Sequence, residues 1–468
     1  MRFKALTEKQ IVQIHEQTIL LLSKKGVAMT DISAREVFLR NGATVKGEHV
    51  LIPEKLIGQA LQDAPSSFTV RARNRDRDVL IGHGLKAVHS TAAGVPFILD
   101  SSGERRNATF EDFKDMLKLT QTSPVVQVGC CGALYPDHFR KQQALCLQMY
   151  YTLLMTDKPV VGLSEDEHIS GMSIDMIERT LGTNDETVSI AICNSLSPMK
   201  WDKKMLDSIR VYAERGQAIN ISCCSMAGAT SPIYLAGCVL EANAEILAGI
   251  TYAQLIRPGT PVIYGTTSSV IDMSNLSLVL GTPEYSLISS ACAQMAAHYR
   301  LPYRSGGGLT DAKDVDAQAG MESVMNHRMS ADIGINFILQ SVGVLESFMT
   351  VSFEKWILDE ETLLRLRFLD RGIEEFQEDL WSVIADGAES GGFLMAESTV
   401  AQMKSELYWP MVTDRRGYDA YGKGGKSFKD LLTEKVKSRL ESYREPVIEP
   451  EARERLERIT ESFMRILA

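Results

Sequence analysis

The fold is indicated by residues 187–223, where the β-prone runs Thr187-Val-Ser-Ile-Ala-Ile192 and Ala218-Ile-Asn-Ile-Ser-Cys223 enclose the helical stretch Lys203–Arg215. A strand, a helix and a second strand of these lengths are typical of a βαβ unit, in which the two strands lie parallel in one sheet. The same alternation continues in both directions along the chain. We therefore expect an α/β fold built from such units.

Eight short apolar runs occur between residues 87 and 341: Ala87–Thr91, Val125–Cys131, Pro159–Leu163, Thr187–Ile192, Ala218–Cys223, Pro261–Gly265, Pro302–Gly306 and Ile335–Ser341. The helical stretches between them are Phe110–Thr120, Phe139–Met155, Glu167–Leu181, Lys203–Arg215, Tyr234–Ile256, Pro283–Tyr299 and Asp316–Asp332. Eight units over about 255 residues match the size of a (β/α)₈ TIM barrel. A doubly wound sheet is the alternative, but the near-regular spacing favours a closed barrel.

The segments on either side of the barrel differ from it in pattern. Residues 1–86 predict an N-terminal α+β subdomain, with a helix over 7–25 capped by Thr7, a hairpin near Asn41–Gly42 and Lys46–Gly47, and a strand at 68–72. The barrel itself is assigned to residues 87–353. Residues 354–468 predict a helical C-terminal extension, with helices at 355–368, 373–389, 399–404 and 449–467 and a loop at 421–426.

Composition excludes several classes of protein. The chain has 468 residues, 44% of them apolar and 24% charged, as in ordinary globular proteins. Its 50 Lys and Arg against 60 Asp and Glu give a net charge of −10, the opposite of a nucleic-acid footprint. We find no membrane span and no signal peptide in the sequence, and eight cysteines in such a chain are typical of reduced thiols. A cytoplasmic protein that binds neither nucleic acid nor membrane is expected.

The barrel prediction directs attention to the carboxyl ends of the strands, where the active sites of such barrels lie. The richest segment follows the seventh strand and reads Leu309-Thr-Asp-Ala-Lys-Asp-Val-Asp-Ala-Gln318. Asp311, Lys313 and Asp316 are our candidate catalytic residues, and Gln318 is a candidate for substrate binding. The alternative is a solvated loop in which Asp316 only caps the next helix.

The cysteines offer a second kind of site. Cys130–Cys131 and Cys223–Cys224 lie at two strand ends and Cys193 at a third, and zinc accepts three or four such ligands. Neighbouring residues of a strand point to opposite faces, so each pair offers one inward thiol. The sequence contains no C-x-x-C, H-E-x-x-H or G-x-S-x-G motif. We therefore expect buried apolar thiols and no metal site.

A series of short motifs gives the chain a family resemblance. It includes Asn194-Ser-Leu-Ser-Pro-Met199, Met226-Ala-Gly-Ala-Thr-Ser-Pro232, Leu235-Ala-Gly237, Asn243-Ala-Glu245, Pro258-Gly-Thr-Pro-Val-Ile-Tyr-Gly265, Thr282-Pro-Glu-Tyr285, Leu301-Pro-Tyr-Arg304 and Leu309–Gly320. In this order the motifs resemble the trimethylamine methyltransferase (MttB-like) family. The resemblance implies a barrel that moves a methyl group from an amine to the cobalt of a separate corrinoid protein.

One feature of that family is absent. Its founding trimethylamine enzymes contain pyrrolysine inside the barrel, whereas every position here is a standard residue. The chain resembles the branch that acts on quaternary amines such as glycine betaine, proline betaine or carnitine. A quaternary ammonium leaves as a neutral tertiary amine that needs no proton, so the shortage of recognisable acid–base pairs agrees with this branch.

The resemblance implies cobalamin carried by a partner corrinoid protein, with no metal bound by the chain itself, and we expect a homo-oligomer. Glycine betaine is the first-choice substrate. Its cation needs aromatic faces or carboxylates, and its carboxylate needs donors. The substrate-binding candidates are Phe97, Tyr135, Tyr264, Tyr303, Arg304, Gln318 and Glu346. Since strand residues alternate, only one of Tyr303 and Arg304 can point inward.

Two other functions fit the sequence. One is a zinc-dependent corrinoid methyltransferase, in which a thiolate-held metal activates the substrate. The other is a betaine-binding protein without catalytic activity. Required stoichiometric zinc would distinguish the first, and betaine binding without methylation of cob(I)alamin would distinguish the second.

Overall fold

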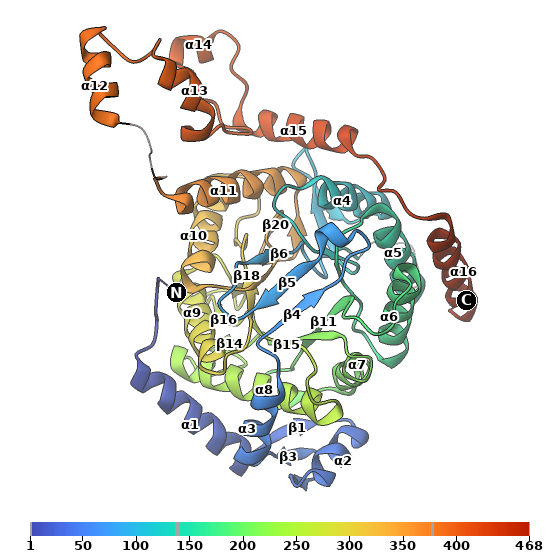
Figure 1. Cartoon of the computed structure of the whole chain (residues 1–468). Helices are drawn as coiled ribbons and strands as arrows, with labels where there is room; N and C mark the ends of the chain where they lie inside the picture. The colour runs from blue at the N-terminus through green and yellow to red at the C-terminus, as the bar shows by residue number, and fades with distance from the viewer. Residues whose placement is uncertain (1, 136–140, 374, 376–378, 468) are drawn as a thin grey trace.

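The computed structural model describes residues 2–135, 141–373, 375 and 379–467. Its centre is a sheet of eight parallel strands in the order β6-β19-β18-β15-β13-β11-β10-β9 (Figure 1). A parallel bridge between Ser90 and Val128 joins the two outer strands, so the sheet closes on itself. The predicted barrel is confirmed, and the doubly wound alternative is wrong.

Each of the eight predicted apolar runs overlaps one barrel strand. The strands are β6 (Val88–His89), β9 (Gly129–Cys130), β10 (Val160–Val161), β11 (Ser189–Asn194), β13 (Ala218–Cys223), β15 (Val262–Thr266), β18 (Tyr303–Gly306) and β19 (Phe337–Leu339). Their side chains alternate between two apolar layers. Residues such as Ile219 and Ile221 pack toward the helices, whereas Ala218, Ile263 and Phe337 belong to the core inside the barrel.

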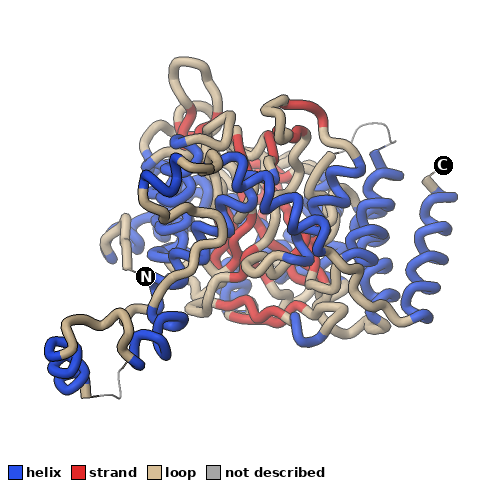
Figure 2. The backbone as a smooth tube through the Cα atoms, turned by 90° about the horizontal axis from the view of Figure 1, so that it is seen from above, coloured by secondary structure: helices blue, strands red, loops and turns tan. Residues whose placement is uncertain are grey.

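Helices surround the strands of the barrel in Figure 1, and Figure 2 shows helices on both sides of the central strands. They are α4 (Phe110–Thr122), α5 (Lys141–Met155), α6 (Glu167–Leu181), α7 (Lys203–Glu214), α8 (Leu235–Ile256), α9 (Pro283–His298), α10 (Ala317–Ile333) and α11 (Phe353–Arg371). Side-chain caps fix many of their starts, for example Thr109 at α4 and Asp316 at α10. The predicted start of α5 at Phe139 lies outside the described residues.

The N-terminal residues cover one side and the amino end of the barrel. This region comprises α1 (Glu8–Lys24), β1 (Val27–Met29), α2 (Ile32–Arg40), β2 (Thr44–Lys46), β3 (His49–Leu51), α3 (Glu54–Asp63), β4 (Ser67–Val70) and β5 (Val79–Gly82). The helices pack on α8, and β1 pairs with β12 (Lys200–Trp201). The β4–β5 hairpin buries Phe68 and Val70 in the core inside the barrel, and the Arg71 amide donates to the Thr187 carbonyl, 2.8 Å. The hairpin therefore closes the amino end of the barrel.

The loops at the carboxyl ends of the strands form two small sheets. One contains β20 (Val344–Leu345), β21 (Thr350–Val351), β7 (Phe97–Leu99) and β8 (Arg105–Asn107). The other contains β14 (Met226–Ala227), β16 (Ser269–Ile271) and β17 (Leu278–Val279). The sequence patterns did not predict these strands, which are only two or three residues long. Together the two sheets build the rim of the barrel mouth.

The C-terminal region is helical, as expected, but its helices differ in detail from those predicted. They are α12 (Leu380–Glu389), α13 (Glu397–Glu406), α14 (Tyr418–Gly422), α15 (Phe428–Ser442) and α16 (Pro450–Ile466). The sequence interpretation missed α15, which packs against α4 and α11, and it also missed α2. The predicted loop at 421–426 overlaps the end of α14. Figure 1 shows α12 and α13 projecting from the barrel beyond α11.

Candidate functional site

The inside of the barrel contains polar groups that have no hydrogen-bond partner among the described residues. Side-chain contacts turn Ile219 and Ile221 toward the helices, so alternation directs Asn220 and Ser222 of β13 inward. Both amide atoms of Asn220 and the hydroxyls of Ser222 and Ser90 are buried without a hydrogen bond. Unsatisfied buried groups are costly and rare, so a cluster of them indicates a place where a polar ligand binds.

Gly265 gives this cluster its room. It lies on β15, beside Ser222 in the register of the sheet. A Cβ atom at residue 265 would collide with the Ser222 hydroxyl and with the Asn220 side-chain oxygen. The absence of a side chain at Gly265 thus allows two polar side chains of the neighbouring strand to lie inside the barrel.

Arg304 is the charged member of the interior. Tyr303 and Ser305 bond to Ser289 of α9, so alternation turns Arg304 into the barrel. The Arg304 side chain is 3% exposed; its Nη2 donates to Gln340 Oε1 at 2.9 Å, and its Nε has no partner. Burial lowers the pKa of Arg304, and no carboxylate pairs with it among the described residues.

A buried guanidinium without a counter-ion is expensive in a protein interior. A planar carboxylate is the group that a guanidinium binds best, through two parallel hydrogen bonds. Arg304 and the neutral side chains of Asn220, Ser222 and Ser90 therefore form an arrangement suited to a small molecule that carries a carboxylate. We call these four residues the interior polar cluster.

Asp311 ties three loops of the barrel mouth together. Its carboxylate accepts from the amides of Leu280 at 2.8 Å and Gly281 at 2.9 Å, and from the Ser347 hydroxyl at 2.5 Å. The loops after the sixth, seventh and eighth strands therefore meet at one carboxylate. Asp311 is 9% exposed. This buried carboxylate therefore fixes the loops of the mouth to one another, and it is also a candidate catalytic residue.

The other candidates of the same loop have local partners. Lys313 Nζ donates to the Asp311 carbonyl at 2.6 Å, and Asp316 caps α10 through the Ala319 amide at 3.0 Å. Gln318 donates to Glu322 at 2.8 Å, and Glu322 in turn accepts from Thr310 and the Asp311 amide. The structure thus gives Asp316 the capping contact of the alternative interpretation, and it gives Lys313 and Gln318 contacts that brace the loop.

Phe97 and Glu346 are brought together at the rim by Arg105. The Arg105 guanidinium lies 3.6 Å from the centre of the Phe97 ring, and its Nε donates to Glu346 Oε2 at 2.7 Å. This face of Phe97 is already covered by a protein cation. Glu346 and the next two residues, Ser347 and Phe348, have positive φ angles, a strained conformation that is often found at functional sites.

The two tyrosines of the strands point away from the interior. The Tyr264 hydroxyl donates to Asn243 of α8 at 2.9 Å, and the Tyr303 hydroxyl bonds to Ser289 of α9 at 3.0 Å. Both rings are buried between strands and helices. The expectation that they present faces to a ligand in the barrel is not met by this geometry, because both hydroxyls bond to outer helices and the inward positions beside them belong to Ile263 and Arg304.

Tyr135 lies on the loop after β9, at the rim. Its side chain is 41% exposed, and its ring packs near Gly94 on the loop after the first strand. Burial of the hydroxyl and, to a smaller degree, the negative charge of Glu165 raise the pKa of Tyr135 to about 12. Tyr135 is therefore a neutral aromatic donor at the edge of the mouth.

A buried glutamate braces the loop after the fourth strand, which the sequence interpretation did not assign. Glu245 of α8 accepts from the Met199 amide at 2.6 Å, from the Ser197 hydroxyl at 2.9 Å and from Ser195. Its neighbour Glu241 has an unpartnered oxygen, and burial, followed by the charge of Glu245, raises the pKa of Glu241 to about 7. The Asn243-Ala-Glu245 motif thus contributes to the shape of the mouth.

The cysteines divide as strand alternation requires. Cys131 packs on the helix side with α5 and α6, whereas Cys130 belongs to the core inside the barrel. Burial raises the pKa of Cys130 to about 12, and burial also raises the pKa of Cys193 above that of an ordinary thiol. Within the described ranges, no three His, Cys, Asp or Glu side chains gather in a way that could hold a metal ion.

The interior polar cluster was only partly visible in the sequence. Arg304 was singled out as a donor, but Asn220, Ser222 and Ser90 were not. A signal for two of them exists, since Asn220 and Ser222 occupy alternate positions of an otherwise apolar strand, Ala218–Cys223. Their lack of partners depends on contacts across the barrel and could not be read from the sequence.

Comparison with known proteins places the chain in a family. The family model described as "Trimethylamine methyltransferase (MTTB)" matches residues 1–462. The chain belongs to the MTTB family. The family resemblance that the sequence motifs indicated is confirmed.

Two curated relatives and one solved structure illustrate the likeness of this MTTB family chain. The glycine betaine methyltransferase of Desulfitobacterium hafniense (strain Y51) is 37% identical over 96% of this chain and 95% of that protein. The proline betaine:corrinoid methyltransferase of Eubacterium limosum is 34% identical over 79% and 78%. The crystal structure of the Methanosarcina barkeri monomethylamine methyltransferase has a TM-score of 0.53 at 12% identity, over 94% and 93%. That likeness shows the shared fold.

Proposed function

We propose that this MTTB family member transfers a methyl group from a quaternary amine to the Co(I) of a cognate corrinoid protein and releases a tertiary amine. The names of the relatives support the reaction, because a glycine betaine enzyme and a proline betaine:corrinoid enzyme match most of the chain. Glycine betaine is our first-choice substrate. It is a quaternary ammonium with one carboxylate on a short tail.

The buried Arg304 is the observation that carries the choice of a betaine. Among the residues that the structure describes, its Nε lacks a partner, and its Nη2 donates to the neutral Gln340. A substrate carboxylate would supply the missing counter-ion, and an amine without a carboxylate would leave the guanidinium unpaired. Asn220, Ser222 and Ser90 add neutral donors and acceptors. These can bind the polar groups of a dipolar molecule and bring no further charge into the barrel.

The reaction balances without a proton. Cobalt in Co(I) supplies an electron pair to the methyl carbon, the C–N bond breaks, and its electron pair stays on nitrogen. The cobalt becomes methyl-Co(III), and the amine leaves neutral. The chain needs to hold the methyl group in line with the incoming cobalt. Such positioning can lower the activation barrier by several kcal/mol.

The mouth of the barrel is where the corrinoid protein has to approach, since the amino end is closed by the β4–β5 hairpin. Asp311 holds the loops after the sixth and eighth strands in register, and the strained segment at 346–348 forms part of the same rim. We assign Asp311 and Lys313 to the positioning of these loops. Phe97, Tyr135 and Glu346 remain candidates at the rim.

Further properties are part of the same proposal. We propose a cytoplasmic protein, which the eight unbridged cysteines support, without a metal of its own and without nucleic-acid or membrane partners. None of the helices in the described ranges is both long enough and apolar enough to cross a bilayer. We also propose that the protein is a homo-oligomer.

A substrate screen with purified protein and cob(I)alamin tests the proposal. We expect methylcob(III)alamin to form with glycine betaine or a related ammonium carboxylate, with little from trimethylamine. Turnover of trimethylamine without any betaine or carnitine would overturn the substrate choice. Betaine binding without methylation would favour the binding protein, and turnover that depends on stoichiometric zinc would favour the metal enzyme.

A further inference from the structure

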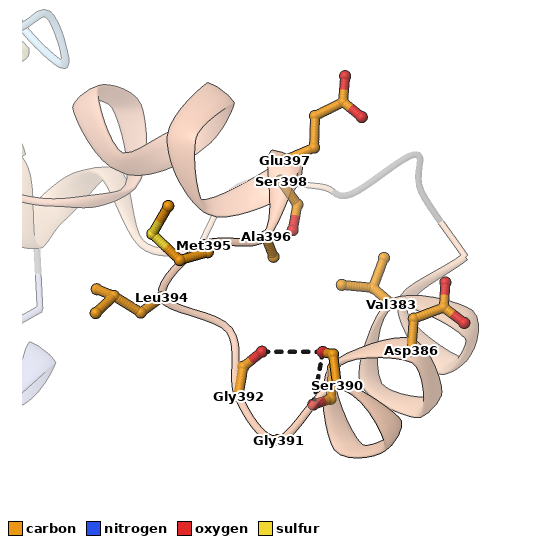
Figure 3. A pocket seen from close by; sticks show the side chains of 11 residues that line it. Val383, Asp386, Ser390, Gly391, Gly392, Leu394, Met395, Ala396, Glu397 and Ser398 are labelled. Carbon is orange, nitrogen blue, oxygen red and sulfur yellow. Dashed lines mark hydrogen bonds between the residues drawn. The ribbon is translucent and has the colours of Figure 1, made fainter.

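Helix α11 links the barrel to the C-terminal region, and its two ends have different surroundings. Beyond its carboxyl end, α12 and α13 enclose a hollow of about 740 Å³, with Val383 on one side and Leu394 and Met395 on the other (Figure 3). Every residue that lines this hollow lies between residues 383 and 398, and none of them belongs to the interior polar cluster. The amino-terminal half of α11, in contrast, contacts the loops that follow the seventh and eighth strands.

That half of α11 carries a fully buried ion pair. Lys355 and Asp359 are one helical turn apart, and both are 0% exposed. The Lys355 ammonium donates to both carboxylate oxygens of Asp359, at 2.5 Å and 2.6 Å. A buried pair of this kind often contributes no more stability than apolar side chains of the same volume, because both charges lose their hydration. Stability alone therefore does not explain why the chain has this pair.

The ion pair also binds the backbone of two loops. Lys355 Nζ donates to the Gly308 carbonyl at 3.2 Å, and Asp359 Oδ2 accepts from the Gly343 amide at 2.8 Å. Gly308 follows the seventh strand, and Gly343 follows the eighth. A Cβ atom at residue 308 would lie 2.9 Å from Asp359 Oδ2 and 2.7 Å from the Ser341 carbonyl oxygen, so the close approach depends on glycine. The pair thus fastens both loops to one helix.

Gln340 lies in the loop that Gly343 fastens, and it contacts Gly308 directly. The Gln340 carbonyl accepts from the Gly308 amide at 2.9 Å, and the Gln340 amide donates to the Thr91 carbonyl at 3.1 Å. Gln340 has a φ angle of 49°, which residues with a side chain rarely adopt. Such a conformation persists where the surrounding contacts impose it. The attachment of Gly308 and Gly343 to α11 therefore helps to fix the backbone of Gln340.

Gln340 in turn orients the buried guanidinium. Gln340 Oε1 accepts from Arg304 Nη2 at 2.9 Å, while Arg304 Nε has no hydrogen-bond partner in the part of the chain that the structure describes. The direction of the free Nε–H thus depends on where Gln340 holds the other end of the guanidinium. A carboxylate binds a guanidinium best through two parallel hydrogen bonds. A chain of contacts therefore runs from the ion pair through Gly308 and Gln340 to the group that we assign to the substrate carboxylate.

We propose that Lys355 and Asp359 are positioning residues for substrate recognition. The pair holds the loops after the seventh and eighth strands so that Gln340 presents Arg304 to the substrate carboxylate. The pair acts on the substrate through these loops, without touching it. This inference rests on the proposed function, because it concerns the carboxylate of a betaine, and it extends that function to a buried pair on an outer helix.

The double variant Lys355→Met with Asp359→Leu tests the proposal. It replaces the pair with apolar side chains, whereas either single substitution leaves one charge buried without its partner. We expect the ratio of kcat/KM for glycine betaine to kcat/KM for tetramethylammonium, which has no carboxylate, to fall at least about tenfold, mainly through a higher KM for the betaine. The fraction of folded protein cancels in this ratio, so a loss of stability alone leaves it unchanged. An unchanged ratio in the double variant would overturn the proposal.

Lys203→Met with Asp207→Leu is the matched control. These residues form a Lys–Asp pair with the same spacing on α7, in which Lys203 Nζ donates to the two Asp207 carboxylate oxygens at 2.9 Å and 2.7 Å. We expect this variant to keep the wild-type ratio. A fall as large as that of the first double variant would be a general effect of removing an ion pair from a barrel helix, and the proposal would then be wrong.

A Gln340→Met variant tests the path of the effect. Methionine has a similar length but lacks the oxygen that accepts from Arg304. If the ion pair acts through Gln340, replacing Lys355 and Asp359 in the Gln340→Met background should change the ratio by no more than about twofold. Independent effects that multiply would contradict the proposed path.

Hydrogen exchange separates this proposal from the proposed reaction, because it needs no turnover. In the variant without Lys355 and Asp359, the amides of Gly308 and Gly343 should exchange at least about tenfold faster than in the wild type. Unaltered protection of both amides would show that the pair does not hold the loops. A wild-type protein that methylates cobalamin with neither ammonium compound would count against the proposed reaction, and the exchange of the two amides would still decide whether the pair holds the loops.

Discussion

Replacing Arg304 by Met should separate recognition of the substrate carboxylate from folding. The methionine keeps much of the length and apolar volume of the side chain and removes the charge. A hydrogen bond to a charged group contributes about 1.5–3 kcal/mol, and removing one partner of a buried charge pair costs about 2–5 kcal/mol. We take about 3 kcal/mol as the loss, which corresponds to a fall in kcat/KM of about 150-fold for glycine betaine.

The same substitution should have little effect on two other measurements. Tetramethylammonium has no carboxylate, so its kcat/KM for cobalamin methylation should change by no more than about threefold. The free protein loses an unpaired buried charge and one hydrogen bond to Gln340, so its Tm should stay equal or rise. Arg257→Gln, at an exposed arginine, is the matched control for the loss of a guanidinium and should alter neither activity nor Tm.

Stopped-flow spectroscopy of cobalamin methylation and differential scanning calorimetry provide the measurements. An equal loss of activity on both substrates, together with a Tm lowered by several degrees, would contradict this role of Arg304. That pattern would mean that Arg304 supports the barrel wall and does not bind the substrate carboxylate.

Asp311→Ala removes the acceptor shared by three loops and should lower betaine-dependent kcat/KM at least about tenfold, or roughly 1.4 kcal/mol. Lys313→Ala should lower it to the same degree. Asp314→Ala, at an exposed residue of the same loop, is the control and should leave kcat/KM unchanged. Unchanged activity in both of the first two variants would remove the loop from the site. Burial raises the pKa of Glu241 to about 7, so its contribution to stability is at its most favourable below the unfolded value near 4.5 and is lost as the pH rises through about 7. Glu241→Gln should therefore reduce the fall in Tm between pH 5 and pH 8, as followed by calorimetry, and an identical pH profile would show that Glu241 ionises normally.

Much of the fold could be predicted because the barrel strands and helices have strong local patterns. The β-branched Ile219 and Ile221 alternate along the run Ala218–Cys223, and α6 begins and ends where the pattern of Glu167–Leu181 indicated. Short helices such as α2 have weaker patterns, and the two-residue strands of the rim depend on pairing with distant segments. Those elements require the tertiary structure.

The site was harder to predict for a related reason. Sequence identifies polar residues near strand ends, but the direction of a side chain depends on the phase of strand alternation. Arg304 points inward and Tyr303 outward, a choice that the sequence left open. The role of Asp311 depends on amides of Leu280 and Gly281, some thirty residues away in sequence, which only the folded chain brings near.

The most direct test of the central claim follows the methyl group itself. Glycine betaine with deuterated N-methyl groups is incubated with the protein and cob(I)alamin, and both products are analysed by mass spectrometry. We predict methylcob(III)alamin that carries an intact CD₃ group, formed in equal amount with a dimethylglycine that keeps its other two CD₃ groups. Dimethylglycine without labelled methylcobalamin, or labelled cobalamin that has exchanged deuterium for hydrogen, would contradict direct transfer of a methyl group from a quaternary amine to cobalt.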